Sequence, residues 1–284
     1  MFEAEERETY CLILRAEPSG VFPLQEIARI LSGALSVPVQ DTAGHLRRNW
    51  GLLHKTGSVN EARRLSQVLA GSGFGSFILS SSNLKTVPPL KVIKKALPAS
   101  EGLIVPETGT MDTPYARGRE TVVPWTGFSL VCAGGFFEEV SAREGEKGKG
   151  KIQNGPGAAQ IITTVALAAA GVPSFGKLKP SGKKVAEAGQ AQKNFNFYLD
   201  LISVEGLENF RICGDGFDYT FLGGRKEQSA LLNFRKMVPD VLSFIPGALR
   251  NRGARAIEER ASDGFKYGDR QEYEGERFWL YQMP

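Results

Sequence analysis

Residues with reactive side chains are few in this chain and lie far apart. The two histidines, His45 and His54, are nine positions apart, and no cysteine or acidic residue accompanies them at the spacing of a metal site. Cys11, Cys132 and Cys213 are odd in number, and each sits in an apolar, strand-like run, which favours buried thiols over redox or metal chemistry. We therefore predict no metal ligand and no cofactor-binding residue.

Three carboxylates in the C-terminal half are candidates for acid–base chemistry. Asp215 is explained by a Gly-Asp-Gly turn, whereas Asp200 and Asp218 could face each other across neighbouring strands. An exposed strand face also favours polar side chains, and we favour that second interpretation. No Gly-x-Ser-x-Gly motif or histidine–cysteine nucleophile system is present, and residues 148–157 (GKGKIQNGPG) lack the Gly-Lys-Ser/Thr of a phosphate loop. We predict no catalytic residue, and an enzyme with a site not recognisable from sequence is the minority hypothesis.

Basic residues are concentrated in one segment. Residues 143–193 contain nine basic and three acidic side chains, a net charge of +6, whereas the whole chain is +4, so the remainder is −2. The basic pI of 8.9 therefore reflects this segment rather than the rest of the protein. Seven of its lysines are the candidate residues for binding an anionic partner: Lys147, Lys149, Lys151, Lys177, Lys179, Lys183 and Lys184.

Between these lysines, residues 152–176 carry no charged side chain. Three interpretations stay open. The Gly, Ala, Pro and Lys content favours a mobile loop. The segment could instead be an interfacial helix whose lysines each contribute on the order of 1 kcal/mol at an acidic leaflet, or a cover over the protein's own surface or a partner's. We expect no transmembrane span, because the strongly apolar run is only about a dozen residues where about 20 are needed.

Arg47, Arg48 and Trp50 form a smaller basic and aromatic cluster. Such a cluster could bind a phosphate and stack on a base. We favour a solvated helix end whose tryptophan packs on the core. The cluster leaves one alternative function open: nucleic-acid binding by the lysine-rich segment together with Arg47 and Arg48. Binding of that kind would depend steeply on salt concentration.

Length and composition indicate two soluble domains. A chain of 284 residues with 42% hydrophobic and 23% charged residues can bury two cores. The first ten residues, MFEAEERETY, are acidic and lack the apolar stretch of a secretory signal. We therefore expect a cytoplasmic protein, one that lies at the inner face of the membrane if it binds lipid.

The N-terminal third predicts a small α/β unit. Strand-like runs at 10–16 and 74–79 flank a helix that begins at Pro23, a second that Asp41 could cap, a short strand at 52–54 and a third helix. The third helix opens with a capping box, Ser58 to Glu61, and should bury Val68. The order β-α-α-β-α-β suggests a ferredoxin-like or split βαβ arrangement with helices on one face.

The C-terminal half predicts strands followed by a helix. We expect strands at 128–133 and 136–141 joined by a turn at Gly134-Gly135, a half-buried strand at 196–203, and a hairpin of 210–213 with 217–222. From Ser229 the apolar period becomes helical. The last residues are charged, with an aromatic group at 278–281 that could be a strand or an anchor against the body.

The Trp125-x-x-Phe128 strand, the runs NFYLDLIS and RICGDGFDYTFL, and the helix from Ser229 together resemble the bacterial pleckstrin-homology-like domain over roughly residues 120–250. The resemblance implies a binding module, since one open end of such a barrel commonly receives a phospholipid headgroup or a peptide. No binding residue is carried over. The predicted fold is α+β, with a ferredoxin-like domain at 1–97, a linker at 98–119, a β-barrel or sandwich domain closed by a C-terminal helix at 120–260, an insertion at 143–193 and a charged tail at 261–284.

The leading functional hypothesis is a non-catalytic binding or scaffolding module without cofactors. Its partner would be a protein or anionic lipid headgroups, contacted through the basic insertion. Nucleic acid is the second hypothesis.

Overall fold

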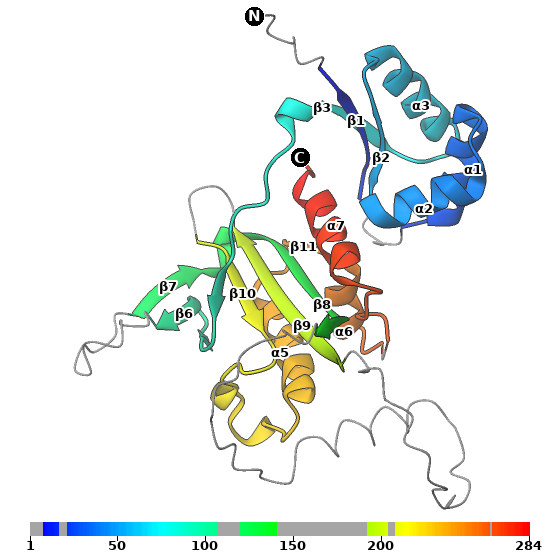
Figure 1. The fold of residues 1–284 in the computed structure, drawn as a ribbon. Coiled ribbons are helices and arrows are strands. Elements are labelled where there is room, and N and C mark those ends of the chain that lie inside the picture. The colour runs from blue at the N-terminus through cyan, green and yellow to red at the C-terminus, as the bar shows by residue number, and fades with distance from the viewer. Residues whose placement is uncertain (1–7, 17–21, 107–119, 141–191, 204–207, 262) are drawn as a thin grey trace, which may run out of the picture. The chain divides into compact units, whose positions relative to one another are not determined.

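The computed structural model describes residues 8–16, 22–106, 120–140, 192–203, 208–261 and 263–284 (Figure 1). Residues 1–138 and 194–284 form one compact unit, and residues 139–193 form a second. The fold described below is that of the first unit, because almost all of the second lies outside the described residues. The seven candidate lysines lie outside them too.

The N-terminal lobe, residues 8–83, is a three-stranded sheet with its helices packed against it. The strand order is β2-β1-β3, and β1 runs antiparallel to both neighbours, so β2 and β3 are parallel and α3 connects them. All residues of β1 except the first are buried, in a core that they share with residues of α1, α3 and α7 (Arg270–Tyr281). The elements are β1 (Tyr10–Leu14), α1 (Leu24–Leu35), α2 (Val39–Asn49), β2 (Leu52–Thr56), α3 (Val59–Gly71), β3 (Ser76–Ser80) and η1 (Ser81–Asn83).

Local sequence signals account for some of these boundaries. The hydroxyl of Ser58 accepts a bond from the backbone N of Glu61 at 3.3 Å, as the capping box predicts, but the Glu61 carboxylate contacts the Thr56 hydroxyl instead of closing the box. Asp41 does not cap α2, since the helix already begins at Val39, after Pro38. Val68 is 38% exposed, so its predicted burial is wrong.

The C-terminal body, residues 84–140 and 192–284, is built around a five-stranded sheet of order β11-β8-β9-β10-β4. The turn predicted at Gly134-Gly135 is wrong, because β8 runs straight through both glycines. Aromatic rings cross the strand there, and a Cβ on Gly134 would overlap the ring of Tyr267. The strands are β4 (Lys91–Ile93), β8 (Phe128–Val140), β9 (Gln192–Ser203), β10 (Phe210–Cys213) and β11 (Leu249–Arg250).

A second, smaller sheet forms where a linker was predicted. β5 (Leu97–Pro98), β6 (Gly102–Pro106) and β7 (Glu120–Pro124) pair antiparallel in that order, so the interval 98–119 includes the strand β6. The last part of that interval lies outside the described residues. Leu103, Val105 and Val123 point from this sheet into the core of the C-terminal body.

The hairpin predicted after residue 210 is also wrong. β10 pairs with β9 on one side and with β4 on the other, and residues 220–225 form the 3-10 turn η3 (Thr220–Arg225). β4 comes from a distant part of the chain, so the local pattern could not reveal it. Another 3-10 turn, η2 (Trp125–Gly127), precedes β8.

Both faces of the five-stranded sheet are covered. Phe197, Leu199 and Leu201 of β9 point into a core with α5 (Ala230–Phe244) and α6 (Arg252–Glu258), whereas Ile202 joins a second core with α7 (Arg270–Tyr281). The predicted alternation along β9 is confirmed, but its half-buried character is not. Ser229 caps α5, as the change of period predicts, and the helix continues through Pro239.

The predicted charged tail contains helix α7, with an Asp269 cap at its start and Tyr273 and Trp279 buried. The fold is therefore mixed α+β, as predicted at that coarse level. The strands that the structure describes form open sheets and do not close into a barrel. Within the described part of the chain, no helix has the length and apolar character that a membrane crossing needs.

Candidate binding site between α2 and α7

Helix α7 attaches the N-terminal lobe to the C-terminal body. The indole Nε1 of Trp279 donates a hydrogen bond of 2.7 Å to the carbonyl of Leu14 in β1. Just past the helix, the Gln282 amide accepts a bond from the backbone N of Lys85 at 2.8 Å and donates to the Lys85 carbonyl at 2.9 Å. Trp279 is 2% exposed, so its bond to Leu14 is shielded from water and holds the two parts in register. Gln282, also 2% exposed, fixes the end of α7 to Lys85, just after the lobe.

Three aromatic rings meet at this junction. The ring centroid of Trp50 lies 5.2 Å from that of Phe22 and 6.4 Å from that of Trp279. The guanidinium of Arg252 lies over Trp50, 5.2 Å from its centroid. Trp50 is only 7% exposed, so base stacking on this residue is excluded and the core-packing interpretation is confirmed.

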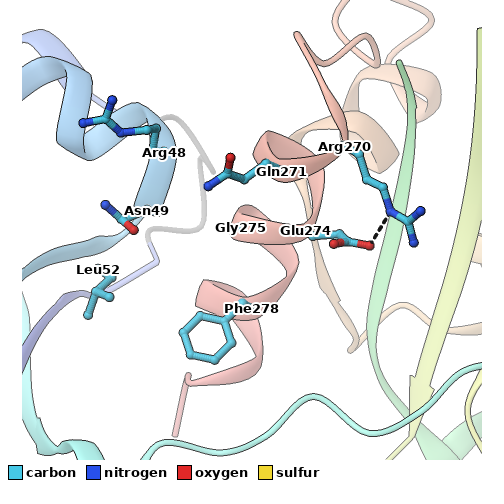
Figure 2. Close-up of a pocket in the computed structure, with 8 residues that line it drawn as sticks. All are labelled: Arg48, Asn49, Leu52, Arg270, Gln271, Glu274, Gly275 and Phe278. Carbon is cyan, nitrogen blue, oxygen red and sulfur yellow. Dashed lines mark hydrogen bonds and ion pairs between the residues drawn. The ribbon is translucent and has the colours of Figure 1, made fainter. Parts of the chain in front are cut away.

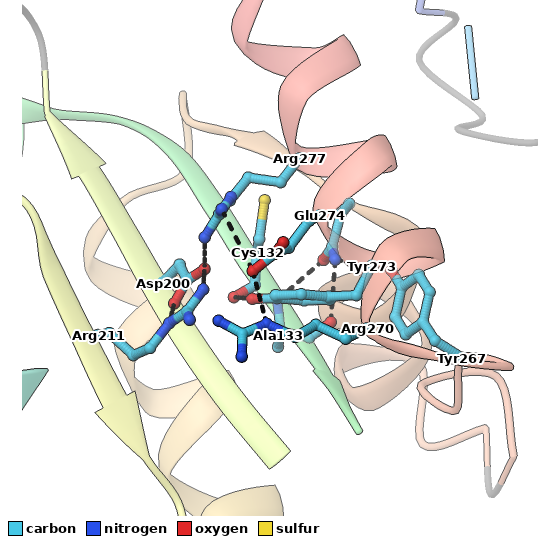
Figure 3. A network of polar contacts seen from close by, with 10 residues as sticks. Cys132, Ala133, Asp200, Arg211, Tyr267, Arg270, Tyr273, Glu274 and Arg277 are labelled. Carbon is cyan, nitrogen blue, oxygen red and sulfur yellow. Dashed lines mark hydrogen bonds and ion pairs between the residues drawn. The ribbon is translucent and has the colours of Figure 1, made fainter. Parts of the chain in front are cut away.

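A buried ion network fixes α7 to the five-stranded sheet (Figure 3). Asp200 on β9 is fully buried, and Arg211 of β10 donates to both of its oxygens at 2.7 Å. Arg277 of α7 donates a third bond, to Oδ2, at 2.6 Å. Both arginine side chains are only 12% exposed. The predicted pairing of Asp200 with Asp218 does not occur, and neither does the predicted exposure of Asp200.

The network continues along α7 towards solvent, with acid and base alternating. Arg277 Nη2 lies 3.9 Å from Glu274 Oε1, and the same oxygen accepts a 2.9 Å bond from Arg270 Nε. Arg270 Nη1 in turn lies 3.7 Å from Glu138 on β8. Arg270 and Glu274 therefore neutralise each other at the edge of the pocket between α2 and α7.

A second buried carboxylate, Glu276, is held by the loops around α6. It accepts bonds from the Tyr267 hydroxyl at 2.5 Å and from the backbone N of Arg252 at 2.8 Å. The Asn251 amide donates to the Tyr267 oxygen at 2.7 Å and to the carbonyl of Ala133 in β8 at 3.0 Å. Burial raises the pKa of Glu276, against the opposing effect of these bonds. Glu276 and Tyr267 resemble an acid–base pair, but at 0% and 4% exposure they are enclosed and serve packing.

An open pocket of about 460 Å³ lies between the end of α2 and the outer face of α7 (Figure 2). Its volume falls in the range of small-ligand sites. Phe278 and Leu52 supply apolar surface, and the amides of Asn49 and Gln271 lie above them in the view of Figure 2. We call it the α2–α7 pocket; it is lined by Arg48, Asn49, Leu52, Arg270, Gln271, Glu274, Gly275 and Phe278.

One cation of this pocket is uncompensated. Arg48 is exposed and forms no ion pair or side-chain hydrogen bond with any residue that the structure describes. Arg270, by contrast, turns away from the pocket towards Glu274 (Figure 2). Asn49 Nδ2 is engaged by the carbonyl and ring of His45 at 3.0 and 3.1 Å, which leaves Oδ1 as an acceptor. The pocket therefore offers an apolar wall, an amide acceptor and a positive charge.

The remaining sequence candidates do not converge on this pocket. Asp218 bonds the backbone N of Thr220 at 3.0 Å and lies 3.5 Å from Lys95. His54 lies 3.6 Å from Glu61. Among the residues that can be described, no three His, Cys, Asp or Glu side chains are placed to share a metal ion. Burial raises the pKa of the Cys132 thiol, which does not favour a reactive thiolate.

Sequence reasoning missed the residues of α7 that build the site. The signal was present: Asp269 precedes the helix, and Tyr273, Glu276 and Leu280 recur at three- and four-residue spacing. A charged residue in the middle of that stripe concealed it, because a buried Glu276 is expected only when partners from elsewhere satisfy it.

No protein-family model, curated protein or solved structure matches this chain.

Proposed function

We propose that this protein is a non-catalytic binding module that contacts an anionic surface through residues 143–193. The single observation that carries the proposal is the charge of that segment, nine basic against three acidic residues. Phospholipid headgroups are the first partner to test, at the inner face of the membrane, and an acidic protein surface is the other version of the same proposal. Each lysine near an acidic leaflet would contribute on the order of 1 kcal/mol.

The attachment of the segment supports this role. It leaves the sheet after β8 and returns in β9, and these two strands are neighbours in the five-stranded sheet. At its base, the Asn196 amide bonds Glu138 at 2.5 Å. Because both ends are anchored in one rigid sheet, a change within the insertion should alter binding without unfolding the body.

We also propose finer fold relationships. The N-terminal lobe would be a ferredoxin-like variant, supported by the parallel pair β2 and β3 joined by α3 around β1. Residues 120–250 would be a PH-like unit, supported by the packing of β8, β9 and β10 against α5 in one core. An experimental structure of the full chain, with its strand order and connections compared with those of the two folds, would test both.

The test of function is co-sedimentation with vesicles. The full chain should pellet with vesicles of phosphatidylserine and phosphatidylcholine and not with phosphatidylcholine alone. A variant lacking residues 145–190, and a variant with the seven candidate lysines changed to Gln, should both stay in the supernatant. The matched control changes the same lysines to Arg, which keeps the charge and should keep the pelleting.

The outcomes separate the versions of the proposal. Equal pelleting of the full chain and the deletion variant would contradict the role of the insertion. Failure of every form to pellet would remove the lipid version. Binding of the full chain, and not the Gln variant, to immobilised poly-glutamate in low salt would then support an acidic protein partner.

A further inference from the structure

We propose that the α2–α7 pocket binds one nucleotide, with its base against Phe278 and its phosphate on Arg48. All residues that line this pocket lie outside residues 143–193, so the proposal does not depend on the insertion. The ligand is a base that carries a phosphate. Either a free nucleotide or a single-stranded nucleic acid could present it.

The apolar wall of the pocket has a free aromatic face. Phe278 is partly exposed and pairs with no other ring in the described part of the chain, unlike Trp50 and Trp279, whose rings stack on each other. Figure 2 shows its ring turned towards Leu52 across the pocket. A flat heteroaromatic ring fits between an aromatic face and an aliphatic side chain, and stacking on such a face tolerates every base.

The pocket also has hydrogen-bonding groups for the edge of a base. Asn49 Oδ1 is available because Nδ2 is held by His45, and this bond fixes the amide so that the acceptor faces outward. Gln271 is exposed and has no side-chain partner among the described residues, so it can both donate and accept. The acceptor Asn49 Oδ1, beside the Gln271 amide that can donate or accept, suits a base with an exocyclic amine, such as adenine or cytosine.

The charge of the pocket favours an anion. Arg270 and Glu274 neutralise each other, so the uncompensated charge is that of Arg48. Arg47, the preceding residue, is likewise exposed and lines a neighbouring pocket with Phe22. Two adjacent arginines on the walls of adjacent pockets suit a chain of phosphates that crosses the end of α2. This arrangement favours a single strand over a free nucleotide.

The experiment measures fluorescence anisotropy of labelled single-stranded 12-mers of dA, dC and dT in low salt. It uses the full chain with the seven candidate lysines changed to Gln, so that the insertion cannot bind the probe. Arg48→Ala should weaken binding by roughly tenfold, and Phe278→Leu by a similar factor because it removes the aromatic face but keeps the packing. Gln271→Ala should reduce the preference for dA and dC over dT.

The matched control is Arg29→Ala, which removes the same charge from an exposed residue of α1 that does not line the pocket. It should change affinity by less than about threefold, and only Arg48→Ala should lower the slope of log affinity against log salt by about 1. Competition by AMP at micromolar concentration would identify a free nucleotide as the ligand; competition only by unlabelled strands would identify nucleic acid.

Three results would overturn the inference. One is the absence of binding to any strand or to AMP at low salt. The second is equal weakening by Arg48→Ala and Arg29→Ala, which would mean diffuse attraction. The third is unchanged binding in Phe278→Leu and Gln271→Ala together. A different outcome would assign the pocket to lipid. In that case the variant with the seven lysines changed to Gln binds acidic vesicles but no nucleotide, and Arg48→Ala abolishes the vesicle binding. Each result is independent of whether the insertion binds its own partner.

Discussion

Arginines meet different surroundings in the two parts of the molecule. In the C-terminal body, Arg211, Arg252 and Arg277 each bond a carboxylate, and the first and third are 12% exposed. In the N-terminal lobe, Arg29, Arg47 and Arg48 are exposed and have no carboxylate partner among the described residues. The paired arginines lie on β10, at the start of α6 and on α7, whereas the unpaired ones lie on α1 and at the end of α2.

The difference indicates which charges belong to the fold and which are available to a ligand. A buried cation must be paired, because an uncompensated charge inside the protein is costly. An exposed cation needs no partner and adds little to stability. Substitution of a buried, paired arginine should therefore mainly lower the stability of the protein. Substitution of an exposed, unpaired arginine should mainly weaken ligand binding.

The largest effect is expected from Asp200→Asn. The substitution leaves the guanidinium groups of Arg211 and Arg277 close together and buried without their shared anion, and should lower the free energy of unfolding by about 3–5 kcal/mol. Urea denaturation measures the change. The matched control is Asp240→Asn, whose partner Arg225 is 57% exposed, and which should cost about 0–1 kcal/mol. Equal losses would contradict the distinction between the two kinds of pair.

A smaller loss is expected where the N-terminal lobe meets α7. A Cβ on Gly51 would overlap the indole of Trp279, so Gly51→Ala should destabilise the protein by about 1–3 kcal/mol. Gly44 lies inside α2 with open space around its Cα, so Gly44→Ala should stabilise it by about 0.5–1 kcal/mol. Thermal and urea unfolding of both variants would check the sign, and stabilisation by Gly51→Ala would show that the lobe is not packed on α7.

The buried carboxyl of Glu276 should give a pH dependence. Burial raises its pKa in the folded protein above the ordinary 4.5, so the folded state holds the proton more tightly than the unfolded state. The stability from this group is complete below about pH 4.5 and is lost as the pH rises through the folded pKa. Its slope cannot exceed about 1.4 kcal/mol per pH unit. Glu276→Gln should remove that part of the slope in urea titrations from pH 4 upward; an unchanged slope would exclude Glu276 as its source.

The smallest stability effect is expected from Arg48→Ala. The side chain is exposed and unpaired, so the free energy of unfolding should change by less than about 0.5 kcal/mol. Arg277→Ala, in the same assay, should cost several times more, because it leaves part of the Asp200 carboxylate unpaired. A loss of more than about 1 kcal/mol for Arg48→Ala would place this arginine with the structural ones.

Much of the N-terminal lobe could be predicted from sequence because its signals are local. Ser58 bonds the backbone three residues ahead, and the apolar period of α1 determines which face it buries. The C-terminal body was predicted less well. The partner of β10 is β4, more than a hundred residues earlier, and the straight path through Gly134 depends on rings from the loop before α7 and from α7 itself.

For the candidate pocket, the sequence supplied Arg48 and its exposed helix end but not the opposite wall. Gln271 and Phe278 lie in a segment whose charged residues obscured its helical period. Trp50 was rightly assigned to the core, although the residues that cover it, Trp279 and Arg252, come from α7 and α6.

The sequence by itself determined what depends on neighbours along the chain: the starts of α3 and α5, the alternation along β9, and the concentration of positive charge in residues 143–193. Only the tertiary structure decided which charges are neutralised. Asp200 and Arg277 are 77 positions apart, and Asp200 joins two cations only because β9, β10 and α7 pack together. Whether an arginine stabilises the fold or remains free for a ligand depends on burial and on partners in space, and neither is encoded at the residue itself.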